Sequence, residues 1–437
     1  MGTAALPLQG LRFAAAPWPA ARSASLLLQM LGGEADGEAI SESDATHLAL
    51  RAGDATVHRP PTTTEQDWQA SGIAGLTGRR AGPALRPPGE PATLARAALL
   101  AVELLRQLPG QSREHASQAV QAPTQRRASL DAGLLGQRAA LLGLQRGGDI
   151  SANGSARLLP TRDGWFALNL PRGSDVELVP ALVESPPTGD PWSTVAQWAH
   201  GRGTREVVER AMLLGLAVAT ARPRPPRDAA RQYAPRAPWT FQPEDSRPCT
   251  EPRRLRVVNL GSLWAAPLCA QMLRHCGMGV VDVQSVHRLE DGPEPFYSLL
   301  HADHVRDTCD FSSAAGRERL RSLLHEADVV IEASRARALR SLGADASRIQ
   351  GDGRPRVWIR ITGHGYGSDR IAFGDDAAVE GGLVAWDAAG PVFVGDAITD
   401  PLTGLLAAVA ALACAHSGRA WTVDVGMTEV ARLAAAS

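Results

Sequence analysis

Asp400 is the residue of this chain whose type and setting best suit covalent chemistry. It stands in the segment GDAITDPLTGLLAAVAAL, residues 395–412, between a glycine-punctuated approach and a long run of small apolar residues with helical spacing. The pattern predicts that Asp400 begins a buried helix, where unpaired backbone N–H groups favour a carboxylate. An aspartate at such a position is often only an N-cap. The two roles are compatible, because the same N–H groups could also hold an oxygen of a bound substrate.

The elements that must position Asp400 have the order of an α/β domain. Residues 255–285 contain a strand, a glycine-containing turn, an amphipathic helix and a second strand, which together make a βαβ unit. The segments ADVVIEASRARALRSLG and RVWIRITGHGYG follow, and then the Asp400 helix. This order predicts a doubly wound sheet, which binds ligands at the carboxyl ends of its strands.

Several familiar catalytic and binding motifs are absent. The turn NLGSLWAAP after the first strand lacks G-x-G-x-x-G, which argues against a dinucleotide-dependent oxidoreductase. No G-x-S-x-G elbow occurs, and the histidines lack HExxH or another metal-binding spacing, so no metal is expected. The turn GHGYG, with Gly363 and Gly365, would let a ligand approach the backbone closely, and His364 within it is expected to pack rather than act as a base.

Several blocks, in one order, resemble a known family. The blocks RVVNLGSLWAAPLCAQML, ADVVIEASRARALRSLG, WIRITGHGYG, DDAAVEGGLVAW and DPLTGLLAAVAAL are similar to the large domain of the family III CoA-transferases. The acid of that family's D-x-x-[TG]-G segment is catalytic, and Asp400, with Thr403 and Gly404, matches it. The resemblance implies that Asp400 attacks an acyl-CoA thioester, giving an aspartyl anhydride and then an aspartyl-CoA thioester. It also implies a Rossmann-like doubly wound parallel sheet with a smaller α+β domain.

The resemblance implies further site residues. Asp375 and Asp376 stand where the family has a second acid or a histidine, and Asp375 is the second catalytic candidate, as a general base or a group that orients the thioester carbonyl. Adjacent aspartates before a helix are as often simply solvated. The candidates for CoA binding are Arg335, Gly363, Gly365, Trp264 and Ala265.

Other positions depart from the family. Around Arg335 the N-F-R-P-G turn is changed, and its basic N-R-G-K-R-S segment has become HADHVRD, residues 301–307, with Arg306 as its one permanent cation. Gln284 replaces a common glutamate. These departures predict weak CoA binding or a different ligand.

The first part of the chain looks like a worn copy of the second. Residues 8–33 share with residues 255–285 a Leu-Arg opening, a tryptophan in a small-residue turn (Trp18 and Trp264) and the sequence Gln-Met-Leu in the following helix. An internal repeat explains these similarities economically.

Two later segments continue the repeat. DWQASGIAGLTG at Asp67 echoes DAAVEGGLVAW at Asp376, and PATLARAALLAVELL at Pro91 echoes the Asp400 segment. The first copy has Pro91 or Ala92 at the place of Asp400. It therefore lacks the nucleophile.

The middle of the chain resembles the family's small domain, with a TRDG turn at residues 161–164 between two short strands. The predicted division is 1–110 for a degenerate large-domain copy, 111–225 for a small-domain-like region with a return segment, 226–253 for an exposed linker, and 254–437 for the Rossmann-like large domain. In the family, each active site lies between one subunit's large domain and the other subunit's small domain. The hypothesis is that this chain fuses such a pair into one polypeptide, as a monomeric pseudo-dimer or a homodimer of it.

Composition narrows the function classes. The 437 residues hold 45 basic and 46 acidic side chains, so no net field recruits nucleic acid or anionic membranes. The chain has no lysine, which excludes a Schiff-base or P-loop lysine and leaves phosphate recognition to arginine. Five cysteines without a CxxC pair are expected to be reduced and mostly buried, and no signal peptide or membrane span is expected. The predicted location is the cytoplasm.

The sequence favours a CoA-transferase that moves CoA from an acyl-CoA to a carboxylic acid without a bound cofactor. A racemase or isomerase is the first alternative, with Asp400 and Asp375 or Asp376 moving an alpha proton. A non-catalytic acyl-CoA-binding homologue is the second. Nothing in the pattern selects the acyl chain.

Overall fold

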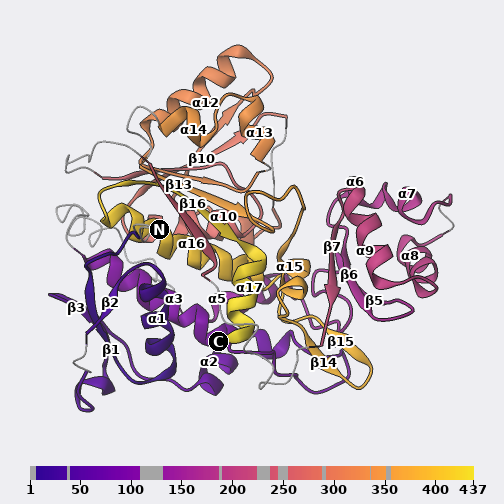
Figure 1. Cartoon of the computed structure of the whole chain (residues 1–437), viewed down its shortest axis with the longest axis horizontal. Coiled ribbons are helices and arrows are strands. Elements are labelled where there is room, and N and C mark those ends of the chain that lie inside the picture. Colours follow the sequence, from indigo (N-terminus) through magenta and orange to yellow (C-terminus); the bar gives the residue numbers. More distant parts are fainter. Residues whose placement is uncertain are drawn as a thin grey trace, which may run out of the picture.

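A computed structural model describes residues 6–36, 40–108, 131–186, 189–223, 237–244, 254–287, 292–334, 336–350 and 356–437 of the chain. Among these residues the strands form four sheets, of seven, four, three and two strands. The seven-stranded sheet and its helices occupy the centre of Figure 1, and the three-stranded sheet with helices α6 to α9 stands apart on the right.

The strands of the seven-stranded sheet lie in the order β11-β10-β9-β12-β13-β16-β8. Six of its strands are parallel: β9 (Arg256–Asn259), β10 (Gly279–Ser285), β11 (Val305–Cys309), β12 (Val329–Glu332), β13 (Val357–Thr362) and β16 (Ala420–Gly426). Chain order reverses between β9 and β12, as in the Rossmann arrangement. The predicted α/β doubly wound fold is confirmed, and in such folds ligands bind at the carboxyl ends of the strands where the order reverses.

The seventh strand corrects one prediction. Trp239–Glu244 lies inside the segment 226–253, which was expected to be an exposed linker, but it forms β8 and pairs antiparallel with β16 from end to end. Phe241 packs edge-on against Trp421 of β16. The strand was missed because two prolines and scattered charges hide a short alternation of aromatic and polar residues, which is enough for an edge strand.

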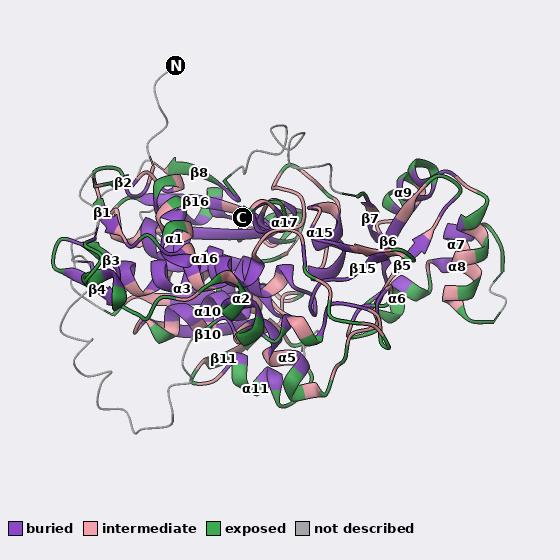
Figure 2. Cartoon of the chain, turned by 90° about the horizontal axis from the view of Figure 1, so that it is seen from below, coloured by how far each residue is buried: buried purple, intermediate pink, exposed green. Residues whose placement is uncertain are grey.

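Helices cover both faces of this sheet. One face packs on α12 (Ala314–Glu326) and α14 (Ala346–Ile349), the other on α10 (Ala265–His275) and α16 (Thr399–His416). Within α16, every residue from Pro401 to Cys414 is buried. It is long and apolar enough to pass for a membrane span, but 83% of that window is buried inside the protein. A central core helix has the same composition, and Figure 2 shows α16 in the buried colour.

The first part of the chain covers α16 from outside. Strands β1 (Arg12–Ala15) and β2 (Glu34–Ala35) are parallel and joined by α1 (Pro19–Met30), while β3 (Leu48–Ala52) and β4 (Ala55–His58) are antiparallel additions. Helix α3 (Pro91–Gln107) packs against both α1 and α16. One hydrophobic core extends from Leu8 to Leu105 and on through the large sheet. The first part is therefore a layer of this core.

The middle part has a core of its own. Its sheet consists of β5 (Ala156–Pro160), β6 (Trp165–Asn169) and β7 (Ala217–Ala221), and the predicted TRDG turn joins the first two strands. Helices α6 (Gly173–Val176), α7 (Val179–Val183), α8 (Pro191–His200) and α9 (Thr204–Leu213) cover one face. The other face packs on Val379, Val384 and Phe393 of the large domain. That contact places β6 and β7 beside α15 (Gly374–Glu380).

Candidate active site

Asp400 lies in the first turn of α16, as its sequence setting predicts. Its backbone N–H donates to the carbonyl of Ala397 at 2.9 Å, which closes the turn that leads into the helix. The surrounding residues of α16 are fully buried, whereas Asp400 is only half-buried. Its carboxylate accepts a hydrogen bond from the backbone N–H of Gly374. An acid at the tip of a core helix thus keeps some access to solvent.

Gly374 is required by the close approach of α15 to Asp400. A Cβ at this position would lie 2.6 Å from Oδ2 of Asp400 and 2.4 Å from the carbonyl oxygen of Ala397. Any side chain would therefore push the carboxylate away from the N–H that binds it. The first residue of α15 and the first turn of α16 form one unit.

Asp375 and Asp376 follow in α15, and both are buried. Asp375 accepts from the N–H of Ala397 at 3.0 Å and so holds that residue at a φ of 43°. Asp376 accepts from Nδ2 of Asn169 and from the N–H of Phe373, each at 3.0 Å. These contacts give both acids a role in fixing the backbone around Asp400.

Among the described residues, the one cation at this cluster comes from the first half of the chain. Arg138, on α5 (Leu134–Leu142), forms a two-pronged ion pair with Asp396, with its Nε 2.7 Å from Oδ2 and its Nη2 2.5 Å from Oδ1. Its guanidinium also lies 4.6 Å from the ring centre of Trp264. Asp396 is fully buried, so this pair is shielded from water and holds α5 against the turn before α16.

Burial sets the protonation of the acids. It raises the pKa of Asp400 to about 7, with Arg138 opposing the shift and Asp396 adding to it. Burial also raises the pKa of Asp375 to about 8, again with Asp396 adding to the shift and Arg138 opposing it. Burial raises the pKa of Asp376 to about 7. Arg138 faces three of the carboxyl groups, those of Asp375, Asp396 and Asp400, and the raised pKa values mean that acids of this cluster hold protons near neutral pH.

The other predicted site residues fall into three places. Trp264 and Ala265 start α10 and are buried, with the carbonyl of Ala265 so near Gly404 of α16 that a Cβ there would lie 2.6 Å from it. Gly363 and Gly365 follow β13, where the carbonyl of Gly363 accepts from the N–H and Oγ1 of Thr428. Arg335 lies outside the described residues. The structure thus places Trp264 and Ala265 near the N-terminal part of α16. Gly363 and Gly365 lie at the end of β13 instead.

The turn before α10 carries a feature that the sequence did not reveal. Leu263 has a φ of 67° and is 58% exposed, an unusual combination for a branched apolar residue. It lies directly beside Trp264, at the carboxyl end of β9, where the chain order of the sheet reverses. Strain and apolar exposure at this edge mark the turn as a candidate contact for a ligand.

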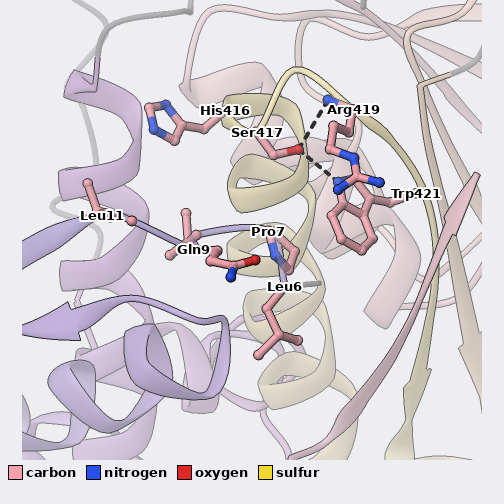
Figure 3. Close-up of a pocket in the computed structure, with 10 residues that line it drawn as sticks. Leu6, Pro7, Gln9, Leu11, His416, Ser417, Arg419 and Trp421 are labelled. Carbon is pink, nitrogen blue, oxygen red and sulfur yellow. Dashed lines mark hydrogen bonds between the residues drawn. The ribbon is translucent and has the colours of Figure 1, made fainter. Parts of the chain in front are cut away.

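A surface cavity lies elsewhere. It has a volume of about 490 Å³ and is lined by Leu6 to Leu11 on one side and by His416, Ser417, Arg419 and Trp421 on the other (Figure 3). These last residues are at the C-terminal end of α16, whose 18 residues separate them from Asp400 by roughly 25 Å. The cavity is therefore not part of the Asp400 site.

Arg138, Asp396 and Asn169 are the site residues that the sequence reasoning missed. Arg138 is one of many arginines in a stretch without a motif, and its partner is 258 residues away. Asp396 was passed over although it lies in the same GDAITD segment as Asp400. The sequence did offer an indication, because an acid four residues before the candidate nucleophile Asp400 could fix the turn that leads into the helix.

A comparison with known protein families bears on this site. Residues 253–436 match the model of CoA-transferase family III. The matched residues contain Asp400, Asp375, Asp376 and Asp396, whereas Arg138 and Asn169 lie in the part of the chain before them.

Individual relatives agree with the family. The chain is 26% identical over 196 residues to succinyl-CoA–D-citramalate CoA-transferase of Chloroflexus aurantiacus, a match that covers 40% of the chain and 48% of that protein. It is 27% identical over 124 residues to (R)-2-hydroxy-4-methylpentanoate CoA-transferase of Clostridioides difficile, covering 25% and 31%. A solved CaiB/BaiF family protein from Brucella suis is 26% identical over 41% of the chain and 53% of its own, with a TM-score of 0.37. The chain spans about half the length, or less, of these relatives.

Proposed function

We propose that the protein is a CoA-transferase that moves CoA from an acyl-CoA to a carboxylic acid through Asp400. The observation that carries the proposal is the half-buried carboxylate of Asp400 at the tip of a core helix, bonded to the N–H of Gly374 and flanked by Arg138 with Asp396. The match of residues 253–436 to the family III model and the relatives named as CoA-transferases support the same activity.

In the proposed reaction, the Asp400 carboxylate attacks the thioester carbon of the donor. The C–S bond breaks, leaving a mixed anhydride on Asp400 and a CoA thiolate. The thiolate then attacks the aspartyl carbonyl, which releases the donor acid and leaves an aspartyl-CoA thioester. The acceptor carboxylate attacks that thioester to form a second anhydride, and CoA thiolate attacks its acceptor carbon to give the new acyl-CoA and free Asp400.

The residues around Asp400 suit these steps. Since burial raises its pKa to about 7, Asp400 is a better nucleophile than a solvated aspartate and is still partly ionised at neutral pH. The N–H of Gly374 and the helix N-terminus could stabilise negative charge as it moves between oxygens. Buried walls around α15 and α16 would limit attack of water on the anhydride.

The site is composite in this proposal. Arg138 and Asn169 come from the first half of the chain and contact Asp396 and Asp376 of the second half. This matches the hypothesis of a pseudo-dimer fused in one polypeptide, with one site per chain. Coenzyme A would be a substrate, and no permanently bound cofactor takes part in the steps. We infer a cytoplasmic location, where acyl-CoA is available.

A racemase or isomerase remains a second candidate because of Asp375. Its pKa is raised to about 8, so it could hold a transferable proton at neutral pH. However, its exposed fraction is only 2% and one oxygen is committed to the N–H of Ala397. Deuterium from D₂O entering the alpha position of an acyl-CoA, without any acceptor acid, would select this activity over CoA transfer.

Isotope transfer tests the covalent step directly. The full chain is incubated with succinyl-CoA, the donor named in the Chloroflexus relative, and with other acyl-CoAs, each with an acceptor acid labelled with ¹⁸O in its carboxylate. We expect ¹⁸O in the peptide that contains Asp400, because the bridging oxygen of the second anhydride stays on the aspartate. Transfer of CoA without label in Asp400 would refute the covalent route. Binding of acyl-CoA without transfer would favour the non-catalytic alternative.

A further inference from the structure

A second cluster of polar side chains lies on β10 of the large sheet and just after α11 (Phe296–Leu300). Asp282, on β10, accepts from two imidazoles at the same oxygen, Oδ2: Nδ1 of His301 at 2.6 Å and Nδ1 of His304 at 2.9 Å. His301 directly follows α11, and His304 lies three residues further. One potential metal-binding atom of each residue lies within 4.8 Å of the others.

Burial distinguishes this cluster from a surface ion pair. The side chains of Asp282 and His301 are each 3% exposed, and that of His304 is fully buried. Among the described residues, Nε2 of both imidazoles is buried without a hydrogen-bond partner. The Asp282 carboxylate holds the proton of each ring on Nδ1, and each Nδ1 presents a lone pair to a metal once that proton moves to Nε2.

A further residue orients the carboxylate. Asn259, at the end of β9, donates from Nδ2 to Oδ1 of Asp282 at 2.8 Å, and its own Oδ1 accepts from the N–H of Gly261 at 3.0 Å. Oδ2 of Asp282 is thus turned toward the two histidines. Outer residues that hold a ligand in this way are typical of protein metal sites.

We propose that Asp282, His301 and His304 form a binding site for a divalent transition metal such as Zn²⁺. Two imidazoles and one carboxylate are ligands that suit Zn²⁺ and its neighbours better than Mg²⁺ or Ca²⁺. Metal bonds of about 2.0–2.2 Å need the three ligand atoms to separate slightly from their present hydrogen-bond distances. In the metal-bound form each Nδ1 coordinates the ion and the ring proton moves to Nε2.

The position of the site suggests a structural effect. Phe296, at the start of α11, packs edge-on against Trp264 with ring centres 5.0 Å apart, and Trp264 lies under Arg138. A metal that joins His301 to β10 would hold the other end of α11 against the sheet. The ion would therefore stabilise the wall that supports Arg138. This inference does not depend on the activity proposed for Asp400.

The first test uses the purified full chain, stripped with a chelator and then titrated with ZnCl₂ or CoCl₂ alone. We expect one ion per chain, a higher unfolding temperature with Zn²⁺, and visible Co²⁺ absorption of the type given by nitrogen and oxygen ligands. A stripped wild-type chain that binds no ion at micromolar Zn²⁺ would overturn the proposal and leave the cluster as a hydrogen-bonded trio.

Variants assign the ion to this cluster. His304→Ala and Asp282→Asn should abolish stoichiometric binding, and Asn259→Ala should weaken it by about 10- to 100-fold. His287→Ala is the matched control, because His287 also pairs with a carboxylate, Asp310 at 3.1 Å, but is exposed. It should bind the metal like the wild type. Binding that survives in folded His304→Ala and Asp282→Asn, or that is lost in His287→Ala, would refute the assignment.

Discussion

Two regions of the molecule are built from similar pieces but differ in their charge. In the first, Trp18 precedes α1, which packs on α3; in the second, Trp264 precedes α10, which packs on α16. The two long helices, α3 and α16, also pack on each other. Only the second region contains the candidate active site, although both share this arrangement of helices.

In the first region, the negative charge of the buried acid Asp67 is paired with an arginine of the same region, Arg96. Asp67 of α2 (Thr64–Ala70) is buried, accepts from Oγ1 of Thr93 at 3.0 Å, and has Arg96 at 3.8 Å. The long helix α3 opens with Pro91 and Ala92, which are both buried and carry no polar group. Asp67 faces one cation, and the two residues that open α3, Pro91 and Ala92, offer no nucleophile.

In the second region the acids outnumber the cation. Asp375, Asp376, Asp396 and Asp400 gather at two helix starts, and the single arginine comes from α5 of the other half. Burial raises the pKa of half-buried Asp400 to about 7, and the nearby carboxylate of Asp396 adds to the shift while Arg138 opposes it. Since both regions share the helix arrangement, the second region differs from the first in its surplus of acids and in the partial exposure of Asp400.

Removing the acid from each region should give the largest contrast. Asp400→Asn should lower the rate of CoA transfer by at least about a thousandfold, because an amide cannot form the anhydride. Asp67→Asn should leave the rate within about twofold. The measurement is the initial rate of CoA transfer between succinyl-CoA and a labelled acceptor. An Asp400→Asn protein that keeps more than a tenth of the activity would break the proposed mechanism.

Removing the cation of the second region should affect both stability and pH dependence. Arg138→Met leaves Asp396 buried without a partner, which should cost about 3–5 kcal/mol of unfolding free energy. It also removes the charge that opposes the raised pKa of Asp400. The wild-type rate should rise with pH through about 7, as Asp400 loses its proton, and this limb should move to higher pH in the variant.

Two further variants separate the effects of Arg138. The double variant Arg138→Met, Asp396→Asn should recover most of the stability, because no buried charge is left alone. Arg96→Met in the first region should leave the pH profile of activity unchanged. A profile that does not move in folded Arg138→Met would show that the arginine acts on packing alone.

The structural elements that depend on local sequence pattern could be predicted from the sequence. The parallel strands, the start of α16 at Asp400 and the TRDG hairpin follow from hydrophobic periodicity and turn residues within short stretches. The antiparallel β3 and β4 and the edge strand β8 were missed, because their pairing depends on which strand edges are left open in the folded chain. Arg138 could not be assigned, because its partner Asp396 becomes a neighbour only through the fold.

A substitution at the contact between α15 and α16 should have an intermediate effect. Gly374→Ala places a Cβ 2.6 Å from Oδ2 of Asp400, which should cost about 1–3 kcal/mol in stability and displace the nucleophile. A displacement near 1 Å lowers a rate by about a hundredfold. The control is Gly75→Ala in the first region, where nothing lies within 4 Å of the added Cβ. Equal activities of the two variants would show that the close approach of Gly374 is not needed.

The smallest expected effect concerns Asp67 of the first region, and it tests whether burial of this acid lowers the stability of the folded protein. Burial is the main cause that raises the pKa of Asp67 above its usual 3.8. Because the folded protein then binds the proton more tightly than the unfolded chain, its stability falls as pH rises above about 4. Asp67→Asn removes this loss, so its stability relative to the wild type should improve as pH rises from 4 to 8. Urea unfolding at the two pH values measures this change in stability. The stability of Asp376→Asn relative to the wild type should change in the same direction and by more, since burial raises the pKa of Asp376 to about 7. If Asp67→Asn instead loses stability as pH rises, the ion pair with Arg96 outweighs burial, and the charge balance of the first region is a stabilising feature in its own right.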